Sequence, residues 1–220
     1  MQQINKVMDI RAAISRVKDG DRVMVGGFGL RGTPDPLVDA LVEHGAKDLT
    51  IISNDLGSPG EGLGKLLRNK KIKNLIGNYY NWNTEVADAY NAGEIGVTLV
   101  PQGTFAESIR AAGVGIPAYF TPTSAGTQLG EGKEVREFNG RKYVLEEAIK
   151  ADVALVKAYK ADTLGNLVYC KVARNFNPAM AMAADYTIAL VDEIVEPGAL
   201  DPESVVTAHI FVNAIVKEAK

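Results

Sequence analysis

The chain has 220 residues, of which 46% are hydrophobic and 23% are charged, and its net charge is −3. This composition excludes a disordered chain, and the charge gives no positive field that would indicate nucleic acid as a partner. One cysteine and two histidines exclude a disulfide framework, a cysteine-rich metal site and most all-histidine metal centres. The first twenty residues carry charges throughout and have no continuous apolar stretch, unlike a signal peptide. No apolar run approaches the roughly 20 residues that span a bilayer. We therefore expect a cytoplasmic protein without a membrane partner and without a metal.

The first half of the chain alternates strand-like and helical patterns. Short apolar runs predict buried strands at 23–25, 49–52, 72–76 and 97–100. Apolar residues at helical spacing predict helices at 9–18, 34–44, 63–68, 84–92 and 103–112. Thr33 is expected to cap the second helix, with Pro34 in its first turn. Alternation of this kind is typical of a mostly parallel sheet with helices on both faces.

The pattern changes after Gly113. Two alternating runs, 134–138 and 142–145, flank Asn139-Gly140, which is the strongest short signal for a β-hairpin. Farther along, the sequence predicts strands at 153–156 and 188–191, a helix that opens at Asn177-Pro178, and a mixed apolar segment at 211–217. There is no internal repeat and no long linker. We therefore expect one domain over residues 1–220, an open α/β sheet flanked by helices with an inserted hairpin.

A glycine-rich loop, GGFGLRGTP, follows the first predicted strand. Glycines there let backbone N–H groups approach a ligand, and ligands of open α/β sheets bind at the carboxyl ends of strands. Gly27, Gly29 and Gly32 match the dinucleotide fingerprint G-x-G-x-x-G, and Asp55 lies near the expected position of its ribose-binding acid. Because Pro34 starts the next helix after the third glycine, all three glycines lie in a longer, open loop, which disfavours a dinucleotide. A tight turn without a ligand is the alternative.

Polar side chains follow two further predicted strands. Gln102 lies between the strand 97–100 and a helix N-terminus, where its uncharged amide can donate a hydrogen bond to a developing oxyanion. The alternative is that this amide only satisfies loop carbonyls. Asn54 either faces a ligand or belongs to a helix cap. Because the carboxyl ends of parallel strands meet at one edge, these residues and the glycine loop are expected to line one cleft.

Other reactive or charged residues are interpreted as structural. Cys170 lies in an apolar run, which favours a buried thiol over a nucleophile. His44 precedes a glycine that ends a helix, where a cation stabilises the last carbonyls. The basic residues of the segment 68–73 could attract phosphates, but a solvated face is the simpler interpretation. The aromatic residues of the segment 79–82 are expected to pack in the core or at a subunit interface.

The string GGFGLRGTP resembles the signature of the A-type subunit of class I coenzyme A transferases of the short-chain 3-oxoacid type. Further stretches that resemble this family are LTIISND, KLLRNKKIKNLIGNYY, VPQGTFAESIRAAGVGIPAYFTPT, REFNGRKYVLEEAIKADVALVKAYKAD and ARNFNP. The similarity runs from about residue 8 to about residue 215. It implies the fold of that family and coenzyme A as a substrate.

The resemblance also implies a mechanism and a partner. Family members move coenzyme A between two carboxylates through covalent intermediates on a glutamate, which lies in a serine-glutamate-asparagine-glycine motif of the second, B-type subunit. That motif does not occur in this sequence. We therefore expect activity only with a B-type subunit, in an A2B2 heterotetramer or a larger assembly. The implied substrates are short-chain acyl-CoA esters and acids of the acetoacetate, acetate, butyrate and succinate class.

The resemblance assigns site residues by matching positions. Gln102, within PQGT, corresponds to a glutamine whose amide helps form the oxyanion hole, and Asn54 corresponds to a cleft-lining asparagine. The segment assigned to coenzyme A binding comprises Gly26, Gly27, Phe28, Gly29, Leu30, Arg31 and Gly32. Arg31 receives no catalytic role. The open alternatives are a sugar-phosphate isomerase, a module that senses acyl-CoA or a sugar phosphate, and a dinucleotide-dependent dehydrogenase.

Overall fold

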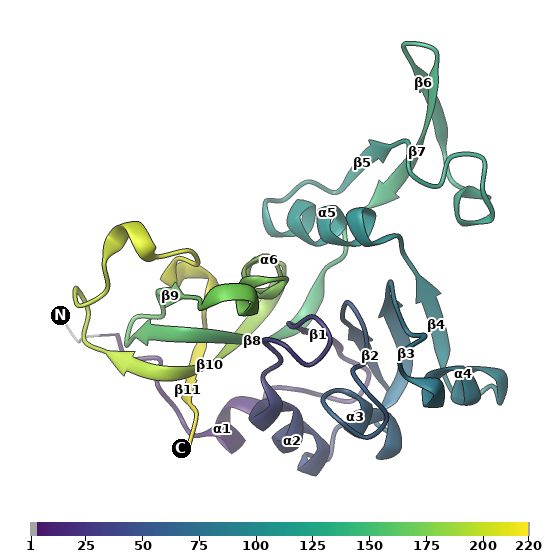
Figure 1. The fold of residues 1–220 in the computed structure, drawn as a ribbon. Coiled ribbons are helices and arrows are strands. Elements are labelled where there is room, and N and C mark those ends of the chain that lie inside the picture. The colour runs from purple at the N-terminus through teal and green to yellow at the C-terminus, as the bar shows by residue number, and fades with distance from the viewer. Residues whose placement is uncertain (1–3, 220) are drawn as a thin grey trace.

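A parallel β-sheet with helices on both faces forms the body of the molecule (Figure 1). The structure is a computed structural model and describes residues 4–219. The spatial strand order is β11-β10-β8-β1-β2-β3-β4, with every neighbouring pair parallel. These strands are β1 (Arg22–Val25), β2 (Leu49–Ile52), β3 (Ile72–Gly77), β4 (Gly96–Leu99), β8 (Ala151–Asp162), β10 (Ala184–Val195) and β11 (Ala214–Lys217). The short β9 (Leu167–Val168) pairs antiparallel with β8.

Helices cover the two faces of this sheet unequally. The helices α1 (Ile10–Ile14), α2 (Asp35–Glu43), α3 (Gly64–Arg68) and α4 (Thr84–Asn91) pack on one face, and α5 (Gln102–Gly113) and α6 (Asn177–Met182) pack on the other (Figure 1). Short 3₁₀ turns occupy η1 (Gln128–Gly130), η2 (Lys171–Arg174), η3 (Pro202–Ser204) and η4 (His209–Phe211). In β1, Val23 and Val25 face the first helical layer while Met24 faces the second. Burial on both faces explains why the strands read as continuous apolar runs.

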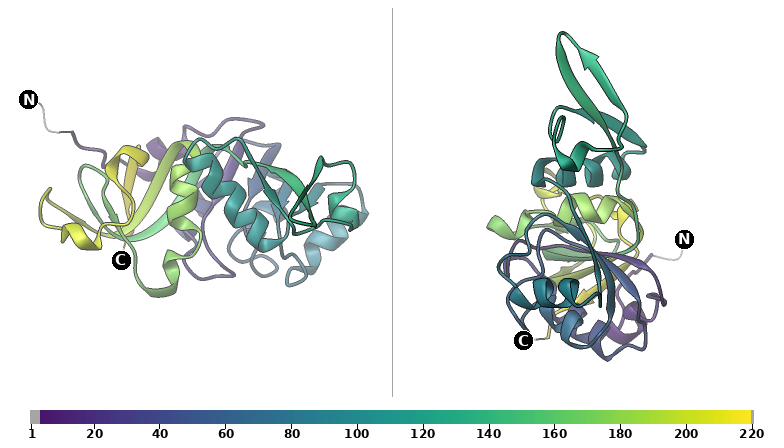
Figure 2. Two further views of the ribbon diagram at one scale, coloured as in Figure 1. Left: turned by 90° about the horizontal axis from the view of Figure 1, so that it is seen from above. Right: turned by 90° about the vertical axis from the view of Figure 1, so that its right-hand side faces the viewer.

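A small antiparallel sheet projects from the body, as the right-hand view of Figure 2 shows. It has the order β5-β7-β6, with β5 (Ala118–Thr121), β6 (Val135–Phe138) and β7 (Arg141–Glu147). Asn139 and Gly140 form the turn between β6 and β7 with φ angles of 50° and 74°, as a tight hairpin requires. Phe138 packs edge to face against Phe120 and Tyr143, at 5.5 and 5.3 Å between ring centroids. The predicted hairpin is confirmed, and β5 adds a third strand that the sequence analysis did not predict.

Most differences from the predicted elements concern their ends. The first helix stops at Ile14 because the N–H groups of Arg16 and Val17 bond to carbonyls three residues back, which tightens the chain into turns. The predicted strands 153–156 and 188–191 are the central parts of the longer β8 and β10. The segment 211–217 contributes the edge strand β11. Within residues 4–219, no helix has both the length and the apolar character needed to cross a membrane.

Candidate active site

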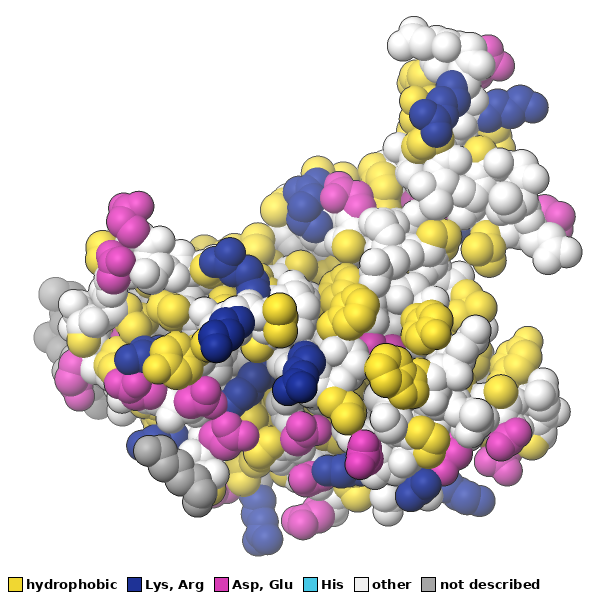
Figure 3. Space-filling model, in the orientation of Figure 1, with side chains coloured by type: hydrophobic (Ala, Val, Ile, Leu, Met, Phe, Trp, Pro, Cys, Tyr) yellow, Lys and Arg dark blue, Asp and Glu magenta, His cyan; other side chains and the backbone are white. Residues whose placement is uncertain are grey.

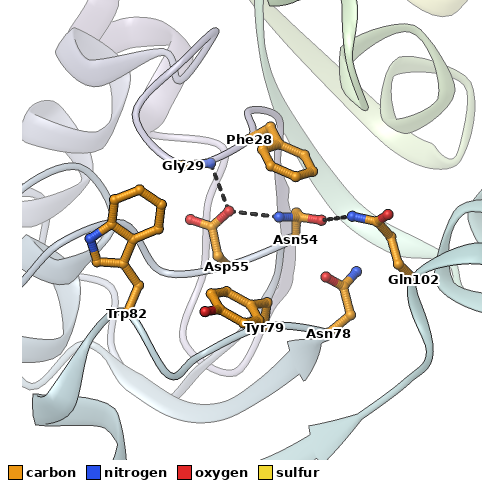
Figure 4. A pocket seen from close by; sticks show the side chains of 8 residues that line it. All are labelled: Phe28, Gly29, Asn54, Asp55, Asn78, Tyr79, Trp82 and Gln102. Atoms are coloured by element: carbon orange, nitrogen blue, oxygen red, sulfur yellow. Dashed lines mark hydrogen bonds between the residues drawn. The ribbon is translucent and has the colours of Figure 1, made fainter.

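A pocket of about 360 Å³ lies at the carboxyl ends of β1 to β4 (Figure 4). The segment that follows each of these four strands contributes to the pocket. The lining residues are Phe28, Gly29, Asn54, Asp55, Asn78, Tyr79, Trp82 and Gln102. Of the predicted site residues, the pocket brings together Phe28 and Gly29 of the glycine loop, Asn54 and Gln102, which lie up to 74 positions apart in the sequence, from residue 28 to residue 102. Parallel strands cause this convergence because their carboxyl ends share one edge of the sheet.

A chain of hydrogen bonds connects three of these loops (Figure 4). The Nε2 group of Gln102 donates to Oδ1 of Asn54 at 3.0 Å, and Nδ2 of Asn54 donates to Oδ2 of Asp55 at 2.7 Å. The backbone N–H of Gly29 donates to the same carboxylate oxygen at 2.7 Å. The other oxygen of Asp55 accepts the N–H of Gly57 at 2.8 Å.

The segment after β2 is buried and tied to its neighbours on both sides. Asn54 is 2% exposed and Asp55 is 7% exposed, whereas Gln102 lies at the surface. The Asn54 carbonyl accepts the backbone N–H groups of Asn78 and Tyr79, each at 3.2 Å. Because α3 begins only at Gly64, Asn54 does not belong to a helix cap, and that alternative is wrong. Its side chain instead reaches the pocket from a buried segment that is hydrogen-bonded to the residues after β3.

Asn78 is a pocket residue that the sequence analysis did not single out. Its Nδ2 atom is buried and has no hydrogen-bond partner among the described residues. An unpaired buried amide costs about 1–3 kcal/mol, so this donor is available to a bound molecule that offers an oxygen. The signal that could have found it is its position directly after β3, which matches that of Asn54 near the end of β2.

The glycine loop has an exposed tip, which we define as residues 28–31. Phe28 and Arg31 exchange backbone hydrogen bonds of 3.0 Å, so the tip is a two-residue hairpin turn. Gly29 occupies its first central position with a φ of 59°, in the left-handed region that glycine favours. Phe28 and Leu30 are 51% and 44% exposed, respectively. A second cavity of about 600 Å³ is lined by the tip together with Gly57, Ser58 and Trp82.

The loop also has a base, which we define as Gly26, Gly27 and Gly32, and this base contacts protein. A Cβ at Gly26 would lie 1.8 Å from Oδ1 of Asn177, and one at Gly27 would lie 2.6 Å from Oγ1 of Thr33. Both glycines are buried. These two positions therefore need glycine because side chains of the protein fill the space around them.

The third glycine of the base packs against the segment 171–177. A Cβ at Gly32 would lie 2.9 Å from the backbone of Ala173, and the φ of Gly32 is 73°. Asn177 donates to the Gly32 carbonyl at 3.0 Å, and Asn175 donates to the Arg31 carbonyl at 2.9 Å. The stretch ARNFNP, residues 173–178, thus packs directly against the glycine loop and is hydrogen-bonded to it.

Thr33 has a different role from the predicted one. The helix α2 begins at Asp35 after Pro34, and no side chain caps it. The Thr33 hydroxyl is buried and donates to the Gly29 carbonyl at 3.3 Å. The threonine therefore closes the glycine loop instead of capping the helix. The helix still starts after all three glycines, as the position of Pro34 predicts.

The aromatic residues after β3 divide between core and pocket. Tyr80 is 8% exposed and packs in the core, whereas Tyr79 and Trp82 are 51% and 66% exposed and line the pocket. Figure 3 shows hydrophobic side chains at the surface below the projecting sheet. Burial raises the pKa of the Tyr80 hydroxyl, and the negative charge of Asp55 raises it further, so the phenol stays protonated at neutral pH. Core packing is confirmed for Tyr80 alone.

Apart from the aromatic residues, the reactive and charged residues that were interpreted as structural lie away from the pocket lining. Cys170 is exposed, so the prediction of a buried thiol is wrong: β9 ends at Val168, and the chain turns outward into η2. The His44 ring contacts the Val17 carbonyl at 2.9 Å. Arg68 forms an ion pair with Glu85 at 2.6 Å, in keeping with a solvated charged face. In the part of the chain that the structure describes, no three acidic, histidine or cysteine side chains group as a metal would require.

Comparison with known proteins identifies relatives over nearly the whole chain. The Coenzyme A transferase family model matches residues 7–218. The A-type subunit of the succinyl-CoA:3-ketoacid coenzyme A transferase of Helicobacter pylori is 51% identical over 218 residues, which cover 99% of this chain and 94% of the relative. The A-type subunit of the 3-oxoadipate CoA-transferase of Pseudomonas putida is 49% identical over 216 residues, covering 97% and 94%.

Solved structures confirm the predicted fold. An acyl-CoA transferase from Escherichia coli O157:H7, in a thioester complex with CoA, aligns with a TM-score of 0.87 at 20% identity, over 97% of this chain and 50% of that chain. Our chain thus spans half the length of that protein. Glutaconate coenzyme A-transferase from Acidaminococcus fermentans aligns with a TM-score of 0.85 at 22% identity, over 96% and 75%. With the near-complete family match and the two curated relatives, these alignments show that the chain belongs to the coenzyme A transferase family, among its A-type subunits.

Proposed function

We propose that this chain, as one domain over residues 1–220, is the A-type subunit of a short-chain acyl-CoA:carboxylate CoA-transferase whose nucleophilic glutamate lies on the B-type subunit. The supporting observation is the chemistry of the pocket. Asp55 is the one carboxylate among the described lining residues, and it already accepts three N–H groups, from Gly29, Asn54 and Gly57. The pocket therefore supplies hydrogen-bond donors, while the attacking carboxylate comes from the partner, in an A2B2 heterotetramer.

The proposed reaction proceeds through two kinds of covalent intermediate. The glutamate carboxylate attacks the thioester carbonyl of the donor acyl-CoA, the carbon–sulfur bond breaks, and an acyl-glutamyl anhydride and the CoA thiolate form. The thiolate then attacks the glutamyl carbonyl, which releases the donor acid and leaves a glutamyl-CoA thioester. The acceptor acid repeats these steps in reverse. Each tetrahedral intermediate places a negative charge on an oxygen, which donors in a preorganised site stabilise.

Gln102 is the proposed donor to that oxygen. Its amide uses one N–H to reach Asn54 at 3.0 Å, and an amide nitrogen carries two. Gln102 is also the first residue of α5, and no side chain caps the first turn of this helix. The positive end of the helix dipole adds a favourable field for negative charge at this point. Asn54 is proposed to hold the glutamine and to line the cleft.

The glycine loop is proposed to bind coenzyme A through its tip. The tip lines the second cavity, and its exposed side chains are those of Phe28, Leu30 and Arg31. Arg31 carries the positive charge suited to a phosphate. Gly26, Gly27 and Gly32 then contribute by fixing the position of the tip. In this proposal the base gives the shape, and the tip makes the contacts.

The proposed substrates are succinyl-CoA as donor and a short 3-oxo acid such as acetoacetate as acceptor. Both curated relatives carry a 3-oxo acid in their names, the 3-ketoacid enzyme of Helicobacter pylori and the 3-oxoadipate enzyme of Pseudomonas putida. The amide donors of Asn54, Asn78 and Gln102 suit oxygens of such acids. Acetate and butyrate are compared with acetoacetate as acceptors, and faster transfer to either of them would contradict this choice of substrate.

The test compares the isolated chain with its complex with a cognate B-type subunit. Formation of acetoacetyl-CoA from succinyl-CoA and acetoacetate is expected only in the complex, and borohydride reduction of the glutamyl thioester should label the B-type subunit. In the complex, Gln102→Ala should lower kcat by about 10²–10³-fold with little change in KM. Transfer by the isolated chain, or a label on a carboxylate of this chain, would contradict the proposal.

A further inference from the structure

We infer that Asp55 is a positioning residue: its buried carboxylate sets the direction in which Asn54, and through it Gln102, present their amide groups to the pocket. This inference rests on the proposed function, because it assigns the N–H of Gln102 to the reacting oxygen. It goes beyond that function because the buried carboxylate of Asp55, together with Gln102 itself, determines where the Gln102 N–H points.

The direction follows from what each group can donate or accept. An ionised carboxylate only accepts hydrogen bonds, so Asn54 must turn its Nδ2 toward Oδ2 of Asp55, at 2.7 Å. The Oδ1 atom of Asn54 then faces Gln102, and an amide oxygen also only accepts. Gln102 must therefore turn Nε2 toward it, at 3.0 Å. The reverse orientation of Asn54 would bring two oxygens to that 2.7 Å separation, which is repulsive.

The carboxylate is well suited to fix this direction because it does not move freely. Asp55 is 7% exposed, and the backbone N–H groups of Gly29 and Gly57 hold one oxygen each, at 2.7 and 2.8 Å. Hydrogen bonds to an ionised acceptor are shorter and stronger than those between neutral groups. The same carboxylate thereby links the tip of the glycine loop to the amide pair.

Loss of the carboxylate would leave the amide pair without a preferred direction. The two orientations of an asparagine or glutamine amide have almost the same shape, so packing alone does not select between them. Once the Asn54 amide rotates by half a turn, its Nδ2 faces Gln102. Gln102 then turns its side-chain oxygen toward Asn54 to accept that hydrogen bond. A fraction of the molecules then lack the Gln102 N–H in its present place.

A double-mutant cycle in the complex with the B-type subunit tests this inference. Asp55→Ala should lower kcat by about 10- to 100-fold and change the KM for the acceptor acid by less than about threefold. Asp55→Asn keeps one oxygen for Gly29 and Asn54, and should retain kcat within about tenfold of the wild type. In a Gln102→Ala background, Asp55→Ala should lower kcat by less than about threefold, because the donor it positions is already gone.

The outcomes separate this inference from the function on which it rests. Equal factors for Asp55→Ala in both backgrounds would mean that the carboxylate acts independently of Gln102, and would overturn the inference alone. A wild-type complex without transferase activity would overturn the proposed function and this inference with it. Thermal unfolding and recovery of the complex accompany each variant. If Asp55→Ala does not assemble, Asp55→Ser takes its place, since a hydroxyl can donate or accept and so does not fix the direction of Asn54; its loss of kcat must disappear in the Gln102→Ala background.

Discussion

The base and the tip of the glycine loop use glycine for different reasons. At the base, a side chain on Gly26 or Gly27 would collide with protein atoms at 1.8 and 2.6 Å. At the tip, a Cβ on Gly29 would meet nothing within 4 Å, and only its φ of 59° favours glycine. The base glycines therefore serve packing, and the tip glycine serves a turn that faces open space. A glycine-rich motif marks the loop, but it does not say which glycines face a ligand.

The largest effect is expected for Gly26→Ala at the base. The new methyl would displace Oδ1 of Asn177, which accepts the N–H of Lys157 at 2.8 Å. Overpacking together with a broken, partly buried hydrogen bond should lower the free energy of unfolding by about 3 kcal/mol. Urea denaturation measures this change. Gly45→Ala is the matched control, since a Cβ there meets nothing within 4 Å and its φ is not in the left-handed region.

Asn177→Ala provides a second check on this packing. It removes the atoms that the Gly26 methyl would strike, at the loss of the Asn177 hydrogen bonds to Gly32 and Ala173. The double variant should therefore be more stable than the sum of the two single effects indicates. Additive losses, or a Gly26→Ala protein as stable as the Gly45→Ala control, would contradict the packing role of the base.

Local sequence patterns were sufficient to predict the strands whose ends form the site. Four apolar runs placed β1 to β4, and alternation with helices made them parallel, so that Asn54 and Gln102 had to meet at one edge. The hairpin followed from Asn139-Gly140, because a tight turn needs positive φ angles there. Each of these features depends on residues close together in the chain.

Contacts between distant segments could not be predicted in the same way. Asn177 reaches the carbonyl of Gly32 across 145 positions, and no local pattern records that pairing. Thr33 has the residue type and place of a helix cap, but its hydroxyl finds the Gly29 carbonyl once the loop folds back. Cys170 is exposed because β9 ends two residues earlier, at Val168, a boundary that apolar character alone does not fix.

A smaller effect is expected for Gly29→Ala at the tip. A non-glycine residue with a φ near 59° costs about 1–2 kcal/mol, but the added methyl meets no neighbour. The free energy of unfolding should fall by about that amount, clearly less than for Gly26→Ala. Gly29→Asn is the companion variant, since asparagine tolerates this region better and should recover part of the loss. If Gly29→Ala lowered the free energy of unfolding as much as Gly26→Ala does, the tip would be packed as tightly as the base.

The smallest effect on stability is expected for Phe28→Ala, which instead tests what the tip contacts. Phe28 is 51% exposed, so the free energy of unfolding should change by less than about 0.5 kcal/mol. If the tip binds coenzyme A, loss of the ring should raise the KM for acyl-CoA by about three- to tenfold, which corresponds to about 0.6–1.4 kcal/mol of binding. Ile210→Ala, at a residue 69% exposed in η4, is the control and should change neither quantity. An unchanged KM for Phe28→Ala would show that the ring does not contact acyl-CoA, and would leave the exposed Arg31 as the residue of the tip suited to bind it.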